Sequence, residues 1–339
     1  MKKNKLNNLT LYLILIDMNN LWIEKYRPNK IEDILVDDNI KVEINKIIRE
    51  KNIPNMILTG TPGIGKTTTL LCIAKKLYGK YFEDAVLELN ASDERGIKLI
   101  NNGDLNAFCT QKLPYSGKEA KDYAPHKLII FDEADNMTEK ALPIISILMD
   151  KFYMTTRFVF TCNTSSKIIE SIQSRCKIIR YVRLATEQIT LRLEEILNFE
   201  NIKYDKKAIK EIAQLSGGDM RHSINLLQLV SDRFKNVTLE NINILCETPP
   251  NNIISDILSN IKKDMKKTLK ILFELKESGY SVNDIFIGFL NYLKSPNTTI
   301  NEEYKMNILL VVSEYLYNVS KYSDTDINLT SFAIDLAKI

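Results

Sequence analysis

The chain has 339 residues, which is more than one typical domain and predicts two or three. Hydrophobic residues make up 45% and charged residues 26%, so a sizeable core is possible, while a net charge of +3 is too small to identify a partner. The five cysteines form no CxxC pair, which argues against a structural zinc site and against a disulfide framework.

The first 20 residues form a segment of their own. A basic stretch, residues 1–5, precedes the apolar run Leu9–Ile16 and superficially resembles a short signal peptide. The run is at the short end of that class, no small-residue cleavage site follows, and it is far too short to span a bilayer. Because Met18 opens the segment that looks like the first domain, we interpret residues 1–20 as a poorly ordered extension or a misassigned start, and we expect no membrane partner.

Short apolar runs alternate with helix-like or loop-like sequence up to about residue 182. Each run has the length of a strand, and the alternation predicts a parallel sheet with helices on both faces. Strands that are buried on both faces should be continuously apolar, as Leu128–Phe131 is. The predicted strands are residues 56–59, 85–89, 128–131, 157–162 and 178–181.

A phosphate-binding loop follows the first predicted strand and matches the pattern GxxxxGK[ST]. It reads Gly60-Thr61-Pro62-Gly63-Ile64-Gly65-Lys66-Thr67, and Thr68 continues into a predicted helix that ends at Tyr78. The glycines allow backbone N–H groups to point at phosphate oxygens, and the helix N-terminus adds a positive dipole end. We expect Lys66 to reach the β- and γ-phosphates of ATP and the Thr67 hydroxyl to bind Mg²⁺.

An acidic sequence, Asp132-Glu133-Ala134-Asp135, ends the third predicted strand. At the carboxyl end of a parallel strand, the first two carboxylates can face the nucleotide crevice. Asp132 would hold Mg²⁺ through water, and Glu133 would polarise the attacking water. The alternative is a solvated acidic turn, and the preceding P-loop favours the catalytic interpretation. Asp135 is predicted either to join this group or only to cap the next helix.

Helical patterns replace the alternation after Leu184, and we find no convincing strand there. Thr186 is predicted to cap the first of these helices. Ser281–Asp284 resembles a capping box ahead of another helix, and residues 301–320 and 327–339 are predicted to form two more. The best candidate linker is Thr248-Pro249-Pro250.

Several motifs, in order, resemble the AAA+ ATPases and, within them, the small subunits of replication factor C, the eukaryotic sliding-clamp loader. The motifs are Trp22-Ile23-Glu24-Lys25-Tyr26-Arg27-Pro28, the P-loop, Glu88–Gly96, the acidic sequence, Ser174-Arg175-Cys176 and Gly218-Asp219-Met220-Arg221. The resemblance runs from Trp22 to about Leu229, and residues 167–176 look most like replication factor C subunit two. It implies an α/β AAA+ P-loop domain with a five-stranded parallel sheet (21–184), an α-helical lid (185–247) and an α-helical C-terminal collar (251–339).

The resemblance also implies roles for individual residues. Asn163 looks like the sensor that orients the lytic water, and Arg221 like the lid arginine that contacts the γ-phosphate. Arg175 looks like the arginine finger, which in this family acts in the ATP site of a neighbouring subunit. From the sequence alone, Asn163 could be an ordinary turn residue and Arg175 a surface arginine. The implied nucleotide-binding residues are Tyr26, Arg27, Pro28, Val36, Gly60, Pro62, Gly63, Ile64, Gly65, Lys66, Thr67, Thr68, Asn163 and Arg221.

The function implied by the resemblance is ATP-driven loading of a sliding clamp onto primer-template DNA in replication and repair, by a nuclear hetero-pentamer. The alternative is a catalytically weak scaffold that donates Arg175 to a neighbour, and a third possibility is another AAA+ motor such as a helicase-type ring. Two departures concern DNA. The paired arginines that the family usually carries fall on Ser146 and Ile147, with Pro143 interrupting the region, and residues 98–104 keep a single lysine. We therefore expect a reduced contribution to DNA binding, with Lys112, Lys118 and Lys121 as possible substitutes.

Overall fold

The computed structural model describes residues 21–339 apart from residues 92–103, 117–120, 246–248, 295–299 and 322–324. The predicted extension at residues 1–20, the Ser92–Gly96 part of the family motif, Lys98, Lys118 and Thr248 therefore lie outside the described residues. The chain divides into two compact units between Val237 and Thr238.

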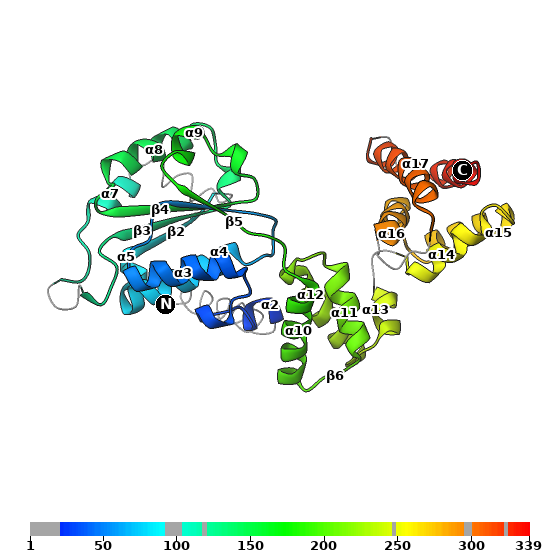
Figure 1. The fold of residues 1–339 in the computed structure, drawn as a ribbon, viewed down its shortest axis with the longest axis horizontal. Helices are drawn as coiled ribbons and strands as arrows, with labels where there is room; N and C mark the ends of the chain where they lie inside the picture. Colours follow the sequence, from blue (N-terminus) through cyan, green and yellow to red (C-terminus); the bar gives the residue numbers. More distant parts are fainter. Residues whose placement is uncertain (1–20, 92–103, 117–120, 246–248, 295–299, 322–324) are drawn as a thin grey trace, which may run out of the picture. The chain divides into compact units, whose positions relative to one another are not determined.

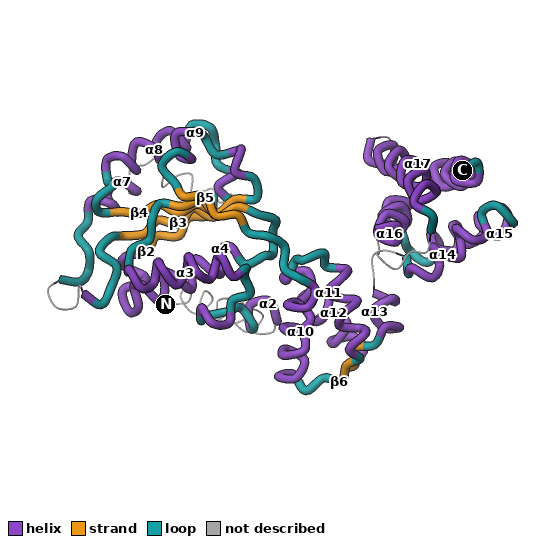
Figure 2. Tube along the Cα trace, in the orientation of Figure 1, coloured by secondary structure: helices purple, strands orange, loops and turns teal. Residues whose placement is uncertain are grey.

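A five-stranded parallel sheet forms the centre of the first unit (Figures 1 and 2). Its strand order is β2-β3-β4-β1-β5, so the strand that leads into the P-loop lies between two strands that come later in the chain. The strands are β1 (Met56–Thr59), β2 (Val86–Asn90), β3 (Lys127–Asp132), β4 (Thr156–Cys162) and β5 (Lys177–Arg180). Their ends agree with the predicted strands to within one residue, and the predicted fold class is confirmed.

Helices cover both faces of this sheet (Figure 1). On one face lie α3 (Asp38–Glu50) and α4 (Lys66–Tyr78), and on the other lies α8 (Ala141–Lys151). Neighbouring residues of β1 point to opposite faces, because Leu58 packs in the core with α3 and α4 whereas Ile57 packs in the core with α8. A strand covered on both sides is thus buried at every position.

The helix α8 is continuous although it contains Pro143. The expectation that Pro143 interrupts this region was wrong, because the proline is in the first helical turn, where its missing N–H has no helical acceptor. Of the two positions that match the family's paired arginines, Ser146 is buried and Ile147 is 67% exposed. The other described α-helices that precede the lid are α2 (Trp22–Lys25), α5 (Phe82–Ala85), α7 (Asp104–Thr110) and α9 (Glu170–Gln173).

The helices that follow the sheet in the first unit are α10 (Thr186–Glu200), α11 (Lys206–Leu215) and α12 (Met220–Phe234). Thr186 does not cap α10, because Ala185 occupies the N-cap position and Thr186 is the first helical residue. The strands β6 (Lys203–Tyr204) and β7 (Asn236–Val237) form a parallel pair that the sequence analysis missed. Two residues are too few to show a period in the sequence.

The helices α14–α18 of the second unit pack around an aromatic core. Phe286 and Phe332 have ring centroids 4.7 Å apart. The predicted capping box is confirmed, because the Asp284 N–H donates to the Ser281 hydroxyl at 3.1 Å and the Ser281 N–H donates to the Asp284 carboxylate at 3.0 Å. The helices are α13 (Leu239–Leu245), α14 (Asn251–Asn260), α15 (Met265–Glu277), α16 (Val282–Lys294), α17 (Glu302–Lys321) and α18 (Asp326–Ala337).

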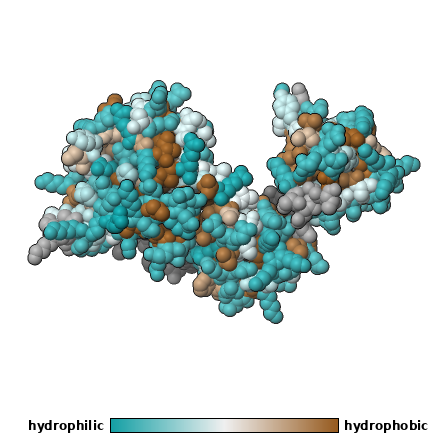
Figure 3. All heavy atoms as spheres, in the orientation of Figure 1, coloured by the Kyte–Doolittle hydropathy of each residue, from teal (hydrophilic) through white to brown (hydrophobic). Residues whose placement is uncertain are grey.

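The face of the molecule in Figure 3 is mainly hydrophilic, with smaller apolar areas on both units. Among the described residues, no helix combines the length and the apolar content that crossing a membrane requires.

Candidate active site

The loop between β1 and α4 is bent by glycines with positive φ. Gly63 has a φ of 71° and Gly65 a φ of 87°, values that residues with a Cβ rarely adopt. The helix α4 begins immediately afterwards at Lys66. The unpaired N–H groups of its first turn and the positive end of its dipole therefore adjoin the loop, as an anion-binding site requires.

The ammonium group of Lys66 lies between the P-loop and the end of β4. It donates to the carbonyl of Gly60 at 2.6 Å, to that of Thr61 at 2.8 Å and to Oδ1 of Asn163 at 3.2 Å. Burial lowers the pKa of Lys66 from its ordinary value, because the protein solvates the charged form less well than water does. Two residues that are far apart in the sequence, Lys66 and Asn163, are thus joined in one site.

A network of hydroxyl groups surrounds the acidic end of β3. Oδ1 of Asp132 accepts a hydrogen bond from the Thr67 hydroxyl at 2.8 Å and another from the Thr161 hydroxyl. The Thr161 oxygen accepts in turn from the Glu133 N–H at 3.2 Å. No sequence motif marks Thr161, although it lies on β4 two residues before Asn163 and lines the same cavity.

Glu133 has an unusual backbone for a residue with a side chain. Its φ of 53° lies in the left-handed region, which costs about 1–3 kcal/mol and persists where the surrounding structure fixes it. The Glu133 carboxylate accepts a hydrogen bond from the Asn136 amide at 3.2 Å, and the sequence analysis did not single out Asn136. Asp135 lines the same cavity and does not cap α8, because Lys140 occupies that N-cap position. Among the described residues, one buried oxygen of Asp135 has no hydrogen-bond partner.

The first turn of α12 contacts the P-loop directly. The Met220 N–H donates to the Gly63 carbonyl at 3.1 Å, and Asp219 caps the helix by accepting from the His222 N–H at 3.0 Å. A Cβ atom on Gly63 would lie 1.8 Å from the Asp219 carboxylate, so only glycine fits here. The contact brings Arg221, the next residue of α12, into the lining of the cavity.

Another wall of the cavity comes from the segment after α2. The Tyr26 hydroxyl donates to Glu200 at 2.6 Å, and Arg192 donates to the Tyr26 carbonyl at 3.1 Å. Burial and the bond with Glu200 raise the pKa of Tyr26, which favours its neutral, hydrogen-bond-donating form. Arg192 also lines the cavity, and no motif in the sequence pointed to it.

Most of the predicted site residues line this one cavity, which has about 1200 Å³ of empty volume including its open mouth. They are Tyr26, Arg27, Pro28, Pro62, Gly63, Ile64, Gly65, Lys66, Thr67, Thr68, Asp132, Glu133, Asn163 and Arg221. Val36 does not line it, because this side chain is 3% exposed and packs in the hydrophobic core; Ile34 and Leu35 reach the cavity instead. Gly60 contributes only the carbonyl that contacts Lys66.

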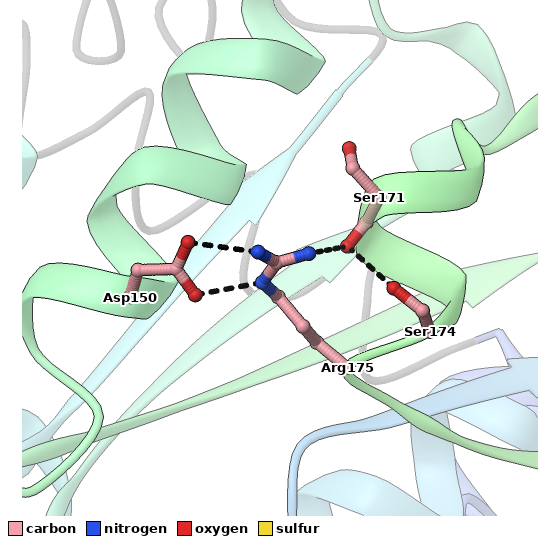
Figure 4. Close-up of polar contacts among 4 residues, drawn as sticks. All are labelled: Asp150, Ser171, Ser174 and Arg175. Carbon is pink, nitrogen blue, oxygen red and sulfur yellow. Dashed lines mark hydrogen bonds and ion pairs between the residues drawn. The ribbon is translucent and has the colours of Figure 1, made fainter.

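Arg175 lies outside this cavity, in the turn between α9 and β5. Its guanidinium is paired with Asp150 of α8 (Figure 4). The structure therefore separates Arg175 from the other predicted catalytic residues of its own chain.

Residues 56–184 match the family model described as ATPase family associated with various cellular activities (AAA). The fold is also that of the RuvB Holliday junction branch migration motor from Thermotoga maritima. That solved structure is 15% identical, with a TM-score of 0.52 over 70% of this chain and 79% of RuvB. The structure of a RuvB variant is also 15% identical and has a TM-score of 0.54 over 83% of this chain and 97% of the variant. Together, the family match, the parallel sheet and the P-loop define an ATPase of the AAA class, which binds nucleotide.

The particular family follows from closer relatives and from the second unit, since residues 249–335 match the replication factor C C-terminal domain. A putative replication factor C small subunit from Acanthamoeba polyphaga mimivirus is 36% identical over 94% of this chain and 96% of the relative. Probable replication factor C subunit 2 from Dictyostelium discoideum is 37% identical over 85% of this chain and 83% of the relative. Replication factor C subunit 4 from Saccharomyces cerevisiae is 38% identical over 78% and 79%. The chain belongs to the family of replication factor C small subunits, as its motifs predicted.

Proposed function

We propose that this chain is an ATP-hydrolysing subunit of a clamp loader. Within a hetero-pentamer, its ATP binding and hydrolysis drive the loading of a sliding clamp onto primer-template DNA during replication and repair. The observation that carries this proposal is the division of the predicted catalytic residues. Lys66, Glu133, Asn163 and Arg221 line one cavity, while Arg175 lies on the surface outside it. Such a chain has most of one ATP site and one residue of another.

The residues of the cavity suit the hydrolysis of ATP. Lys66 would bind the β- and γ-phosphates, since phosphate oxygens are stronger partners for an ammonium group than the neutral carbonyls of Gly60 and Thr61. Asn163 would orient the lytic water, and Glu133 would polarise it. Arg221 would contact the γ-phosphate from α12, so the position of this helix would depend on the bound nucleotide.

Thr67 and Asp132 have the right chemistry for Mg²⁺. Their side-chain oxygens are 2.8 Å apart beside Lys66, and Mg²⁺ prefers hard oxygen ligands, typically one or two carboxylates together with phosphates and waters. When bound, the ion neutralises charge on the phosphates. Asp132 is held toward this position by the Thr161 hydroxyl, which fixes the orientation of its carboxylate.

We propose that residues 251–339, which form most of the second unit, are the oligomerisation collar. On α17, Met306, Leu310 and Tyr317 are 60%, 63% and 58% exposed, and their spacing puts them on one face of the helix. An exposed apolar stripe of this kind is typical of a surface that is covered by a partner. We assign neighbouring subunits of the loader to this surface.

The proposal includes a reduced contribution of α8 to DNA binding. At the positions of the family's paired arginines, Ser146 is buried and Ile147 presents an apolar side chain, so neither can contact phosphate as a cation. Lys112 and Lys121 are exposed and remain candidates for phosphate contacts. Nuclear residence is also proposed, on the basis of the eukaryotic relatives, and imaging of the tagged chain would test it.

The decisive experiment replaces Glu133 with Gln in the assembled complex. Because the change removes the water-polarising carboxylate and leaves the phosphate contacts, ATP should stay bound while hydrolysis at this site falls by about 100-fold or more. Clamp loading should fall with it. Glu139→Gln is the matched control, since Glu139 is exposed and does not line the cavity.

The scaffold alternative makes the opposite prediction. If the chain only donates Arg175 and uses ATP as structural support, Glu133→Gln will change neither ATP turnover nor clamp loading. Lys66→Ala provides a second test, because unchanged ATP binding and clamp loading in that variant would contradict the proposed function itself.

A further inference from the structure

The guanidinium group of Arg175 is held on two sides (Figure 4). Nε donates to one Asp150 oxygen at 2.7 Å and Nη2 donates to the other at 2.9 Å, which is the bidentate geometry of a strong ion pair. Nη1 donates to the carbonyl of Ser171 at 2.5 Å. Since a guanidinium has five N–H donors and these contacts use three, two N–H groups remain for another anion.

The position of Asp150 is not explained by the stability of α8. Asp150 is the last residue but one of this helix, and its side chain is 59% exposed. Aspartate is a poor helix former, and a negative charge in the last turn lies at the unfavourable end of the helix dipole. The bond with Arg175 lowers the pKa of Asp150 and so favours its ionised form. The interaction that favours aspartate here is the one with Arg175.

The backbone that carries Arg175 is already fixed. The Arg175 N–H donates to the carbonyl of Ile172 at 3.0 Å. Ile172 is fully buried, and Cys176 packs against the same core from the other side of Arg175. The remaining conformational freedom is that of the Arg175 side chain, and the contacts with Asp150 and Ser171 restrict its rotamers.

We propose that Asp150 is a positioning residue for the arginine finger. Together with the Ser171 carbonyl, it fixes the plane of the Arg175 guanidinium and leaves two N–H donors for the γ-phosphate in the ATP site of the neighbouring subunit. A guanidinium that is oriented before the reaction stabilises the charge of the transferring phosphoryl group without having to reorganise. This inference rests on the trans role of Arg175 in the proposed function.

The test uses the assembled complex with the chain's own site silenced by Glu133→Gln, so that the remaining ATP turnover comes from partner subunits. The part of this turnover that Arg175→Ala removes is the Arg175-dependent activity. Asp150→Asn should lower this activity about tenfold. The KM for ATP should be unchanged, because the residues that line the partner's ATP site are unchanged. Asp150→Glu should restore most of it, since glutamate keeps two carboxylate oxygens.

Two controls separate positioning from a general structural effect. Glu43→Ala removes another, partly exposed acid, which pairs with Lys177 at 2.6 Å near the same turn, and should leave the turnover unchanged. Adding Asp150→Asn to Arg175→Ala should cause no further loss, because a positioning residue has no effect once the group it positions is gone.

The outcomes distinguish this inference from the proposed function. If Arg175→Ala leaves the turnover intact, the trans role of Arg175 is wrong. If Arg175→Ala lowers turnover but Asp150→Asn leaves it unchanged or raises it, only the positioning role is contradicted. An additive loss in the double variant would also contradict it, since that result indicates a separate structural role.

Discussion

A buried histidine gives the first unit a pH-dependent stability. His126 is 1% exposed, and its Nε2 accepts a hydrogen bond from the Ile53 N–H at 3.2 Å. The neutral ring therefore carries its proton on Nδ1, which lies 3.1 Å from the Tyr78 hydroxyl. Protonation would break the bond with Ile53 and charge a buried group, and burial accordingly lowers the pKa of His126 to about 4.

The free energy of unfolding should therefore decrease as the pH is lowered, because the pKa of His126 in the folded state lies below its unfolded value of about 6.5. The contribution of His126 is fully present above that value and is lost as the pH falls toward 4. From pH 7 to pH 5 this one group should cost the first unit about 2 kcal/mol. Urea unfolding at both pH values, followed by the fluorescence of Trp22, the single tryptophan of the chain, measures this loss of unfolding free energy.

The variant His126→Gln should lose most of this pH dependence, because glutamine can accept a hydrogen bond but does not titrate. His222→Gln, which changes an exposed histidine, is the matched control and should behave like the parent chain. Equal pH dependence in all three proteins would show that His126 is not the responsible group.

At this scale the sequence predicted the residues whose spacing is part of a motif. Lys66, Asp132 and Asn163 meet in the cavity as expected, since each follows or ends a strand at the same edge of the sheet. Thr161 and Arg192 were missed because their contacts depend on which strands and helices become neighbours. That information is absent from local patterns.

At the scale of elements, the P-loop and the start of α12 form one contact. The Met220 N–H donates to the Gly63 carbonyl, and the Asp219 carboxylate occupies the space where a side chain on Gly63 would lie. Trp22 is tied to the same helix, because its backbone N–H donates to Gln228 at 2.8 Å. A change at Gly63 should therefore alter both the packing of α12 and the fluorescence of Trp22.

The pair Gly63→Ala and Gly65→Ala tests this contact. Both residues have positive φ and share the backbone strain of an added Cβ, but only Gly63 has atoms within 4 Å of the new methyl group. Gly63→Ala should thus lower the free energy of unfolding by about 1–3 kcal/mol more than Gly65→Ala. Nucleotide-free unfolding monitored through Trp22 measures the difference, and equal losses would contradict the contact.

Elements were predictable where a pattern was long enough to show. The strands of the sheet contain short apolar runs of strand length, and the capping box of α16 (Ser281 with Asp284) has a fixed spacing. The two-residue strands β6 and β7 exist only because distant segments pair. Pro143 was misinterpreted because its effect depends on its place within the helix, which the sequence did not define.

At the scale of the whole molecule, the proposed function makes the chain incomplete as an enzyme. Its cavity contains Lys66, Glu133, Asn163 and Arg221, while Arg175 points elsewhere and is paired with Asp150. An arginine supplied in trans contributes a factor of about 10³–10⁵ to the hydrolysis rate in related phosphoryl-transfer enzymes. A chain without a neighbour would therefore bind ATP and turn it over very slowly.

The measurement that tests this claim most directly compares ATP binding and ATP turnover in two states of the same chain: a confirmed monomer and the assembled complex. Both states should bind ATP, and turnover at this site should rise at least about 100-fold on assembly. A monomer that hydrolyses ATP at the rate of the complex would contradict the claim that a neighbouring subunit completes the site.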